Sequence, residues 1–174
     1  MKNQEKITFP NILNREFKTN KPNCKFATDI TYIPTRTKMM YLSTVIDLYD
    51  NYPVAWKLSD SQDKSLSIDT IKKLSDIVNL NGCTIHSDQG IHYTSNDYVA
   101  LLKKFNVTQS MSRKGNCYDN SVMENFFGIL KQEMYYGNTY YSFDELKEAI
   151  EKYIKYYNEK RIKEKLGWKS PVEY

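Results

Sequence analysis

Residues 25–58 read KFATDITYIPTRTKMMYLSTVIDLYDNYPVAWKL, and this stretch decides the fold. It is rich in β-branched and aromatic residues, which favour strands, and short polar or proline-containing segments interrupt it. Pro53 is expected at or just before the start of the last strand, where its missing N–H is tolerated. The pattern predicts a meander of three hairpin-linked strands, over residues 25–33, 39–48 and 52–58.

Beyond the meander, helical and strand patterns alternate along the chain. Apolar residues three or four positions apart predict helices, and short β-branched runs predict strands. Thr94 and Ser95 are candidate N-caps, and Ser142 with Glu145 forms a capping box. The predicted elements are helix 63–79, strand 83–87, helix 96–105, strand 106–111, helix 119–136 and helix 142–158. This order predicts an α/β fold with a mixed sheet between helices.

The composition is that of a folded domain. Of 174 residues, 40% are hydrophobic and 26% are charged, which excludes a disordered chain. The longest apolar run, residues 98–102, is too short to span a membrane, and residues 1–10 lack the apolar segment of a secretion signal. The cysteines are odd in number and scattered, which predicts reduced thiols in a cytoplasm: Cys24, Cys83 and Cys117.

Positive charge is concentrated at the N-terminus. Of a formal net charge of +4, residues 1–25 contribute six Lys or Arg against two Asp or Glu. Prolines in this segment oppose regular structure. We therefore expect an irregular basic lead-in, a folded core and a C-terminal tail that packs on the core, at residues 1–24, 25–160 and 161–174. The lead-in either contacts a polyanion or is an ordinary solvated arm.

Three carboxylates occur at unusual positions. Asp29 lies in the middle of the first predicted strand, where an unpaired buried charge is unfavourable. Asp88 follows the fourth strand beside a glycine turn, a common place for ligand sites in α/β sheets. Glu124 lies near the start of the helix over 119–136, and thirty-five residues separate it from Asp88. Taken singly, each has an ordinary alternative: pairing with a lysine, capping a turn or facing solvent.

Taken together, the three carboxylates predict a divalent-cation site. Hard oxygen ligands from separate elements suit Mg²⁺, which takes its remaining ligands from water and substrate phosphates. Two such ions can activate a hydroxyl and stabilise a leaving oxygen, so we expect the carboxylate oxygens to lie within about 4–8 Å of each other. His86 and His92 are the only histidines, which leaves no histidine cluster for zinc.

The helix that carries Glu124 has further functional residue types on the same face. At 100° per residue, Asn120, Gly128 and Lys131 lie close to the stripe of Glu124. Glycine inside a helix costs about 1 kcal/mol relative to alanine, so a bulky partner such as nucleic acid is expected against this face. A solvated face or a close helix crossing is the alternative. The opposite side is predicted to anchor the helix in the core, through Val122, Phe126, Ile129 and Leu130.

At these residues the chain resembles the catalytic domain of bacterial insertion-sequence transposases, which are relatives of retroviral integrases. The matching segments are NCKFATDITY, IHSDQGIHY, QSMSRKGNCYDNSVMENFF and YYNEKRIKEKLGWKSPVEY, at residues 23–32, 85–93, 109–127 and 156–174. The Asp-Asp-Glu triad at this spacing is specific, and the KGNCYDN motif before the glutamate makes the match more specific. One departure is Phe26, where the family usually has tryptophan.

The resemblance implies a ribonuclease-H-like three-layer fold, with a mixed five-stranded sheet flanked by helices. It also implies a polynucleotidyl transferase that cuts DNA and joins the freed 3′-hydroxyl to a target phosphate. Asp29, Asp88 and Glu124 would be both the catalytic residues and the ligands of two ions, Mg²⁺ or Mn²⁺. The DNA phosphates would be contacted by Lys131, Arg113, Lys114, Asn120 and Arg161.

The resemblance also implies partners and a location, and it leaves alternatives open. The active form would be a homo-oligomer on element ends and target DNA, in the bacterial cytoplasm at the nucleoid. Residues 1–24 are too short for the family's helix-turn-helix region, so an upstream protein or domain would supply it. A nuclease that joins no strands is one alternative, and a truncated, inactive or regulatory DNA-binding derivative is another. Residues 118–120 either fix the entry of the glutamate helix or simply cap it.

Overall fold

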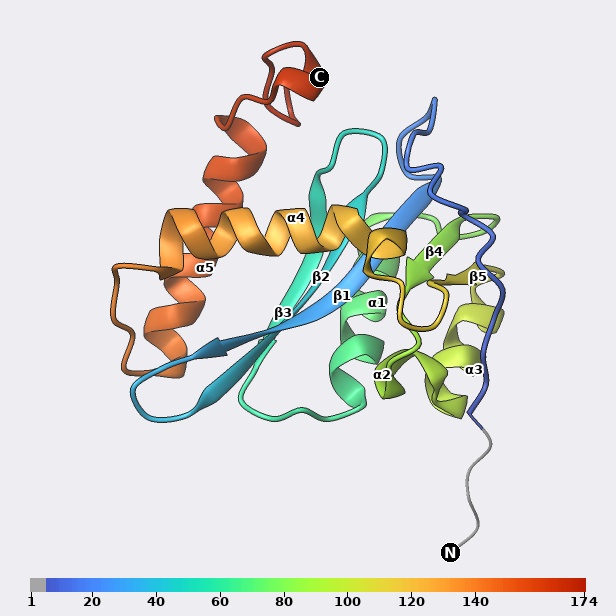
Figure 1. Cartoon of the computed structure of the whole chain (residues 1–174), viewed down its shortest axis with the longest axis horizontal. Coiled ribbons are helices and arrows are strands. Elements are labelled where there is room, and N and C mark those ends of the chain that lie inside the picture. Colours follow the sequence, from blue (N-terminus) through green and yellow to red (C-terminus); the bar gives the residue numbers. More distant parts are fainter. Residues whose placement is uncertain (1–5) are drawn as a thin grey trace, which may run out of the picture.

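A computed structural model, which describes residues 6–174, contains one mixed sheet (Figure 1). Its strands are β1 (Lys25–Pro34), β2 (Met39–Asp47), β3 (Pro53–Ser59), β4 (Thr84–Ser87) and β5 (Thr108–Met111). They lie in the order β3-β2-β1-β4-β5, and the first three are antiparallel neighbours. β4 is parallel to both β1 and β5. The predicted mixed sheet is confirmed, and the first five residues of the predicted lead-in lie outside the described residues.

The helices within residues 6–174 are α1 (Ser65–Ile77), α2 (Ile91–Thr94), α3 (Asn96–Lys104), α4 (Ser121–Leu130) and α5 (Phe143–Glu159). The single helix predicted over 119–136 is instead three pieces. A 3₁₀ turn at Cys117–Asn120 precedes α4, and a π-helical turn at Lys131–Tyr135 follows it. A second 3₁₀ turn, Glu164–Leu166, lies in the tail. In this part of the chain, no helix combines the length and apolar character needed to cross a membrane.

The two faces of the sheet bury two separate hydrophobic clusters. Neighbouring residues in a strand point to opposite faces, so Phe26 and Ala27 belong to different clusters, as do Val45 and Ile46. α4 and α5 supply the helical side of one cluster, whereas α1 and α3 supply the other. The sheet is therefore the middle of three layers, as predicted.

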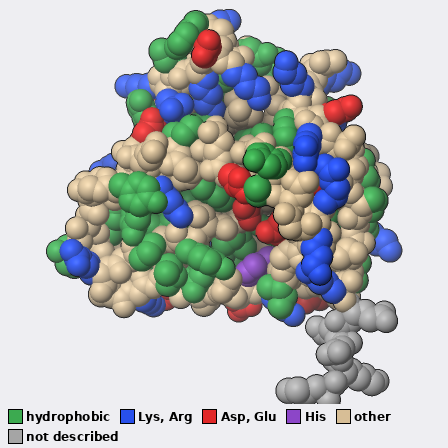
Figure 2. All heavy atoms as spheres, in the orientation of Figure 1, with side chains coloured by type: hydrophobic (Ala, Val, Ile, Leu, Met, Phe, Trp, Pro, Cys, Tyr) green, Lys and Arg blue, Asp and Glu red, His purple; other side chains and the backbone are tan. Residues whose placement is uncertain are grey.

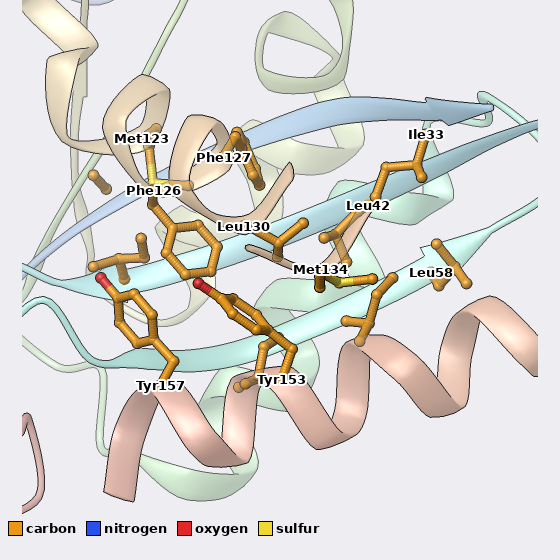
Figure 3. Packing of buried hydrophobic residues seen from close by; sticks show 14 of the residues in the cluster. Ile33, Leu42, Leu58, Met123, Phe126, Phe127, Leu130, Met134, Tyr153 and Tyr157 are labelled. Carbon is orange, nitrogen blue, oxygen red and sulfur yellow. The ribbon is translucent and has the colours of Figure 1, made fainter. Parts of the chain in front are cut away.

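A stripe of buried apolar side chains holds α4 and the turn after it to the sheet and to α5 (Figure 3). The stripe consists of Met123, Phe126, Phe127, Leu130 and Met134. Val122, another predicted anchor, is partly buried and packs against this cluster, whereas the predicted anchor Ile129 is partly buried and does not belong to it. The buried residues instead follow the spacing of three and four from Met123, which leaves Glu124 and Gly128 exposed.

The lead-in runs along the edge of the sheet beside β5 (Figure 1). The carbonyl of Pro10 accepts a hydrogen bond from the N–H of Met111 at 3.2 Å. The N–H groups of Ile12 and Leu13 donate to the Ser110 hydroxyl at 2.9 and 3.0 Å, and the Leu13 side chain is buried. This part of the lead-in is therefore docked on the domain, and the solvated-arm alternative does not describe it.

The C-terminal tail folds back against the end of α5. The N–H of Val172 donates to the carbonyl of Asn158 at 3.0 Å, and the rings of Tyr174 and Tyr49 lie 5.2 Å apart between centroids. Because Tyr49 follows β2, the tail contacts both the last helix and the turn between β2 and β3.

Candidate active site

A cavity of about 460 Å³ lies beside the end of β4, the middle of β1 and the first turn of α4. Asp29, Asp88 and Glu124 all line it. Figure 2 shows acidic side chains gathered in a hollow near the centre of this face, with basic side chains beside it. The structure therefore brings the three predicted carboxylates, from three separate elements, to one place.

Asp29 is half-buried in β1, opposite Thr44 of β2. Its Oδ1 accepts a hydrogen bond from the N–H of Ile30 at 2.8 Å. Burial above all, together with the carboxylates of Asp88 and Glu124, raises the pKa of Asp29 from an ordinary value of 3.8 to about 7, against the opposing effect of the Ile30 bond. The site therefore carries more negative charge than its own residues neutralise.

Asp88 lies just beyond β4, and its position depends on a glycine. Its Oδ1 accepts a hydrogen bond from the N–H of Gly90 at 2.7 Å, which closes a local turn. A Cβ atom on Gly90 would lie only 2.8 Å from this same oxygen. A larger residue would therefore displace the Asp88 carboxylate, although the backbone angles of Gly90, φ −64° and ψ 159°, suit any residue.

Glu124 is exposed in the first turn of α4. Among residues 6–174, neither it nor Asp29 nor Asp88 forms an ion pair with Lys or Arg, which removes the lysine-pairing alternative for Asp29. In the same residues, no three His, Cys, Asp or Glu side chains are already gathered closely enough to hold a metal ion. Glu124 must therefore turn inward before the three carboxylates can share one.

The donor set at the cavity fits a divalent cation of the magnesium type. Unpaired carboxylate oxygens are the hard ligands that such an ion prefers. Asn120 lines the same cavity, and its buried Oδ1 has no hydrogen-bond partner among the described residues. A buried acceptor without a donor, next to unneutralised carboxylates, is the environment that an ion with its bound waters would satisfy.

Three of the five predicted DNA contacts lie at the cavity. Arg113, Lys114 and Asn120 line it on the segment that joins β5 to α4. The Arg113 guanidinium is engaged within the protein, because its Nε and Nη2 donate to the Asp119 carboxylate at 2.8 and 2.7 Å. Lys114 is exposed and has no ion-pair partner in the part of the chain that the structure describes. It is therefore free to meet a phosphate, as is Lys6, which also lines the cavity and is exposed.

The other two predicted DNA contacts lie outside the cavity lining. Lys131 follows α4, two turns beyond Glu124, and burial lowers its pKa. Glu133, a nearby acid on the same segment with which Lys131 could have paired, instead accepts hydrogen bonds from Arg161 Nε at 2.9 Å and from the Tyr153 hydroxyl at 2.6 Å. The pairing of Lys131 with Glu133 is therefore excluded, whereas Arg161 is held in an ion pair.

Asp119 has a fully buried side chain that helix capping does not explain. The 3₁₀ turn before α4 and α4 itself both begin without a side-chain capping bond. The Asp119 carboxylate instead accepts hydrogen bonds from Arg113 and from Arg15 Nε, the latter at 2.8 Å. These bonds, those of Arg113 above all, hold the pKa of Asp119 well below its usual range. The sequence pattern missed Arg15, because no motif links residues 104 positions apart.

His86 connects the lead-in to the wall of the cavity. Its Nδ1 lies 2.9 Å from the Ser110 hydroxyl, and its Nε2 lies 3.1 Å from the hydroxyl of Ser112, which lines the cavity. Ser110 already accepts two backbone N–H bonds, so its own hydrogen is directed at Nδ1 and the ring proton is on Nε2. Burial lowers the pKa of His86, in keeping with this neutral ring.

The sequence has recognisable relatives. Two family models, each described as an integrase core domain, match residues 19–117 and 124–174 of the chain. The chain is 41% identical over 168 residues to a putative transposase of insertion sequence element IS150 from Escherichia coli. It is 38% identical over 170 residues to the transposase of IS904 from Lactococcus lactis. These matches cover 96% and 97% of this chain but only 59% and 67% of the relatives, so the chain spans about three fifths of the first relative's length.

Solved structures with the same architecture are retroviral. A chain of the simian T-cell lymphotropic virus intasome, solved with PP2A regulatory subunit B56 gamma, matches with a TM-score of 0.76 and 18% identity, over 98% of this chain and 59% of that one. The HTLV-2 integrase catalytic core domain in complex with magnesium matches with a TM-score of 0.64 and 17% identity, over 88% of this chain and 96% of that one. The predicted ribonuclease-H-like fold is confirmed, and the chain belongs to the integrase core domain family.

Proposed function

We propose that this chain is the catalytic domain of a DNA transposase, which cuts DNA and joins the freed 3′-hydroxyl to a target phosphate. The observation that supports this most is the cavity. Three carboxylates without an ion-pair partner among the described residues line it, from β1, from the loop after β4 and from α4, in a chain whose relatives are insertion-sequence transposases. A structural role would instead pair these charges with arginine or lysine, as at Asp119.

In this proposal Asp29 and Asp88 are held in place by the sheet, and Glu124 turns inward from α4 to complete the site. Two bound Mg²⁺ or Mn²⁺ ions would supply an activated hydroxyl and stabilise the leaving oxygen. A cation beside Asp29 favours its ionised form, which offsets the effect of burial on its pKa. The HTLV-2 integrase core was solved in complex with magnesium, which supports the choice of ion.

We assign the DNA path to the basic and amide groups around the cavity and along α4. Lys114 and Asn120 are at the cavity, and Lys131 lies further along the same helical face. Arg113 and Arg161 complete the proposed set, although each also serves an internal carboxylate. With a net charge of only +4, the chain alone is expected to bind DNA weakly and without sequence preference.

We further propose that the active form is a homo-oligomer, at the nucleoid of a bacterial cytoplasm, on element ends and target DNA. The neighbours solved as a viral intasome and as a dimeric integrase core support oligomeric action. Recognition of the element ends is assigned to a helix-turn-helix region or protein upstream, because the relatives extend well beyond this chain. The lead-in, core and tail at residues 1–24, 25–160 and 161–174 remain the proposed division.

A strand-transfer assay tests the function. Labelled duplex DNA is incubated with the chain and Mg²⁺ or Mn²⁺, for the unmodified protein, Glu124→Gln and the control Glu148→Gln. Glu148 is exposed on α5 and pairs only with Lys152 at the surface, so its variant should retain activity. Glu124→Gln should bind DNA but neither cut nor join it. Cut but unjoined products from the unmodified chain would indicate a nuclease, and metal-independent binding without cutting would indicate a regulatory derivative.

A further inference from the structure

We propose that Arg15 is a positioning residue for Glu124, acting through the buried carboxylate of Asp119. The inference rests on the proposed function, because it takes Glu124 to act in catalysis. Arg15 lies outside the cavity lining in the described part of the chain, so its effect on the site must be transmitted. Asp119 transmits it, because it lies in the turn from which α4 begins.

Two arginines from distant parts of the sequence converge on Asp119. Oδ1 accepts hydrogen bonds from Arg15 Nε at 2.8 Å and from Arg113 Nη2 at 2.7 Å. Oδ2 accepts from Arg113 Nε at 2.8 Å and from the backbone N–H of Arg113 at 2.9 Å. The carboxylate has no solvent exposure, so among the described residues these charge-assisted hydrogen bonds are the ones that satisfy it. We call this arrangement the Asp119 clamp.

The Asp119 clamp determines where α4 starts. Asp119 lies in the 3₁₀ turn that leads directly into α4, and the N-cap residue Asn120 makes no side-chain capping bond. The first helical turn therefore depends on the clamp for its orientation, and Glu124 lies in that turn. A looser clamp would let Glu124 shift relative to Asp29 and Asp88, which the sheet holds in place.

Arg15 is itself placed by a constrained turn of the lead-in. Asn14 and Arg15 both have left-handed backbone angles, with φ of 45° and 62°. Such a conformation is unfavourable for most residues with a Cβ atom, although less so for asparagine, so the surrounding contacts must hold Arg15 in it. Those contacts are the buried Leu13 side chain and the N–H groups of Ile12 and Leu13 on the Ser110 hydroxyl. The docked lead-in thus holds Arg15 beside Asp119.

Loss of Arg15 alone should loosen the clamp without unfolding the protein. Arg113 would still hold Asp119 through two side-chain bonds and one backbone bond. We expect the effect to fall on kcat, because a misplaced Glu124 impairs the reaction and not the binding of DNA.

Three full-length variants separate the hydrogen bond from the charge. Arg15→Met removes both, whereas Arg15→Gln retains an N–H donor at the position of Nε and removes the charge together with the guanidinium end, whose Cζ lies 6.0 Å from the centroid of the Tyr118 ring. Lys18→Met removes a charge from the same segment but lies outside the clamp. We expect Arg15→Met to lower kcat for strand transfer at least about tenfold with KM for DNA little changed. Arg15→Gln should recover most of the loss, and Lys18→Met should leave kcat unchanged.

Hydrogen exchange gives a readout that does not depend on activity. In Arg15→Met, the amides of residues 117–124 should exchange at least about tenfold faster than in the unmodified chain, while those of β1 and β2 keep their protection. Unchanged exchange at 117–124 would overturn the positioning role. An equal rise of KM in Arg15→Met and Arg15→Gln would also overturn it, by making Arg15 a DNA contact. Faster exchange in a chain that joins no DNA would instead contradict the proposed function and leave the clamp standing.

Discussion

Asp29 and Asp119 are both withdrawn from solvent beside the same cavity, but their surroundings differ. Asp119 accepts hydrogen bonds from two arginines, and its pKa lies well below the usual range. Asp29 accepts only the N–H of Ile30, and burial together with two neighbouring carboxylates raises its pKa to about 7. Within the described residues, the chain thus provides arginine partners for Asp119 and none for Asp29.

The difference separates a structural carboxylate from a functional one. A buried charge that the protein neutralises itself stabilises the fold, and its loss leaves the arginines without a partner. A charge left without a partner makes the folded chain less stable and persists where a ligand will neutralise it. Substitutions that remove each charge should therefore have opposite effects on stability, and they provide the sharpest ways to test the contrast.

The largest expected effect is on activity, from Asp29→Asn. Loss of one of the three carboxylates should reduce strand transfer by on the order of 10³-fold or more, as loss of a catalytic group does elsewhere. In metal-free buffer at pH 8, the same variant should be more stable to urea than the unmodified chain, because it removes an unneutralised charge. If the variant is inactive but less stable to urea than the unmodified chain, Asp29 is not an unneutralised charge.

The raised pKa of Asp29 also predicts how the stability difference between Asp29→Asn and the unmodified chain changes with pH. In the folded chain Asp29 keeps its proton up to pH of about 7, whereas in the unfolded chain it loses the proton near pH 3.8. The folded state therefore binds more protons between these values, and its stability falls as pH rises through this window. The stability advantage of Asp29→Asn should accordingly be present at pH 8 and shrink towards pH 4. Urea unfolding at several pH values, with EDTA present, measures it.

The next effect is on stability, from Asp119→Asn. This substitution replaces charge-assisted hydrogen bonds by weaker ones and should lower the free energy of unfolding by about 2–3 kcal/mol. Because the pKa of Asp119 is lowered, its contribution is present above pH 4 and disappears only as pH falls through its folded value. The loss should therefore be equal at pH 5 and pH 8, unlike the effect of Asp29→Asn. A loss that varies between these pH values would contradict the account of the clamp.

A smaller effect is expected at the glycine beside Asp88. A Cβ atom in Gly90→Ala would lie 2.8 Å from Asp88 Oδ1 and would displace the carboxylate, so metal affinity should fall about 10–100-fold. Gly128→Ala is the matched control, because no atom lies within 4 Å of its new Cβ and an alanine there should stabilise α4 by about 1 kcal/mol. Calorimetric titration with Mn²⁺ measures both variants. Equal affinity in the two would show that Asp88 is not a ligand.

The smallest effect is expected from Lys131→Glu. If Lys131 meets a phosphate, the variant should bind DNA more weakly at low salt, and the slope of log affinity against log salt should become shallower by about 0.9. Metal affinity should be unchanged, because Lys131 lies outside the cavity lining. Fluorescence anisotropy with labelled duplex DNA, at salt concentrations from about 50 to about 300 mM, gives the slope. An unchanged slope would leave Lys131 without a role in binding.

Local sequence signals predicted much of the fold. Strand patterns and caps depend on neighbouring residues, so Ser95 caps α3 through the N–H of Tyr98, and Ser142 caps α5 through the N–H of Glu145. The predicted capping box is only half confirmed, because the Glu145 carboxylate accepts from the N–H of Tyr141 and not from that of Ser142. The short helix α2 was outside the predicted elements, since four residues carry no helical periodicity.

The parts of the site that the sequence did not predict depend on contacts between distant residues. The three carboxylates were found because their positions break the local pattern, and a family resemblance connected them. Arg15 follows the pattern of a basic lead-in, so nothing local marked it as the partner of Asp119, 104 positions away. The buried face of α4 was predicted only in part, because helical spacing shows which residues share a face, whereas contact with the sheet and α5 decides that Met123 and Phe127 are buried.

The most direct test of the central claim is to locate metal at the cavity. Crystals of the chain with bound DNA, grown in Mn²⁺, should give an anomalous peak between the carboxylates of Asp29 and Asp88, with Glu124 turned inward as a further ligand. The same crystals of Asp29→Asn should lose or strongly weaken that peak. A peak elsewhere, or a fully ordered Glu124 directed away from both aspartates with metal and DNA present, would contradict the account.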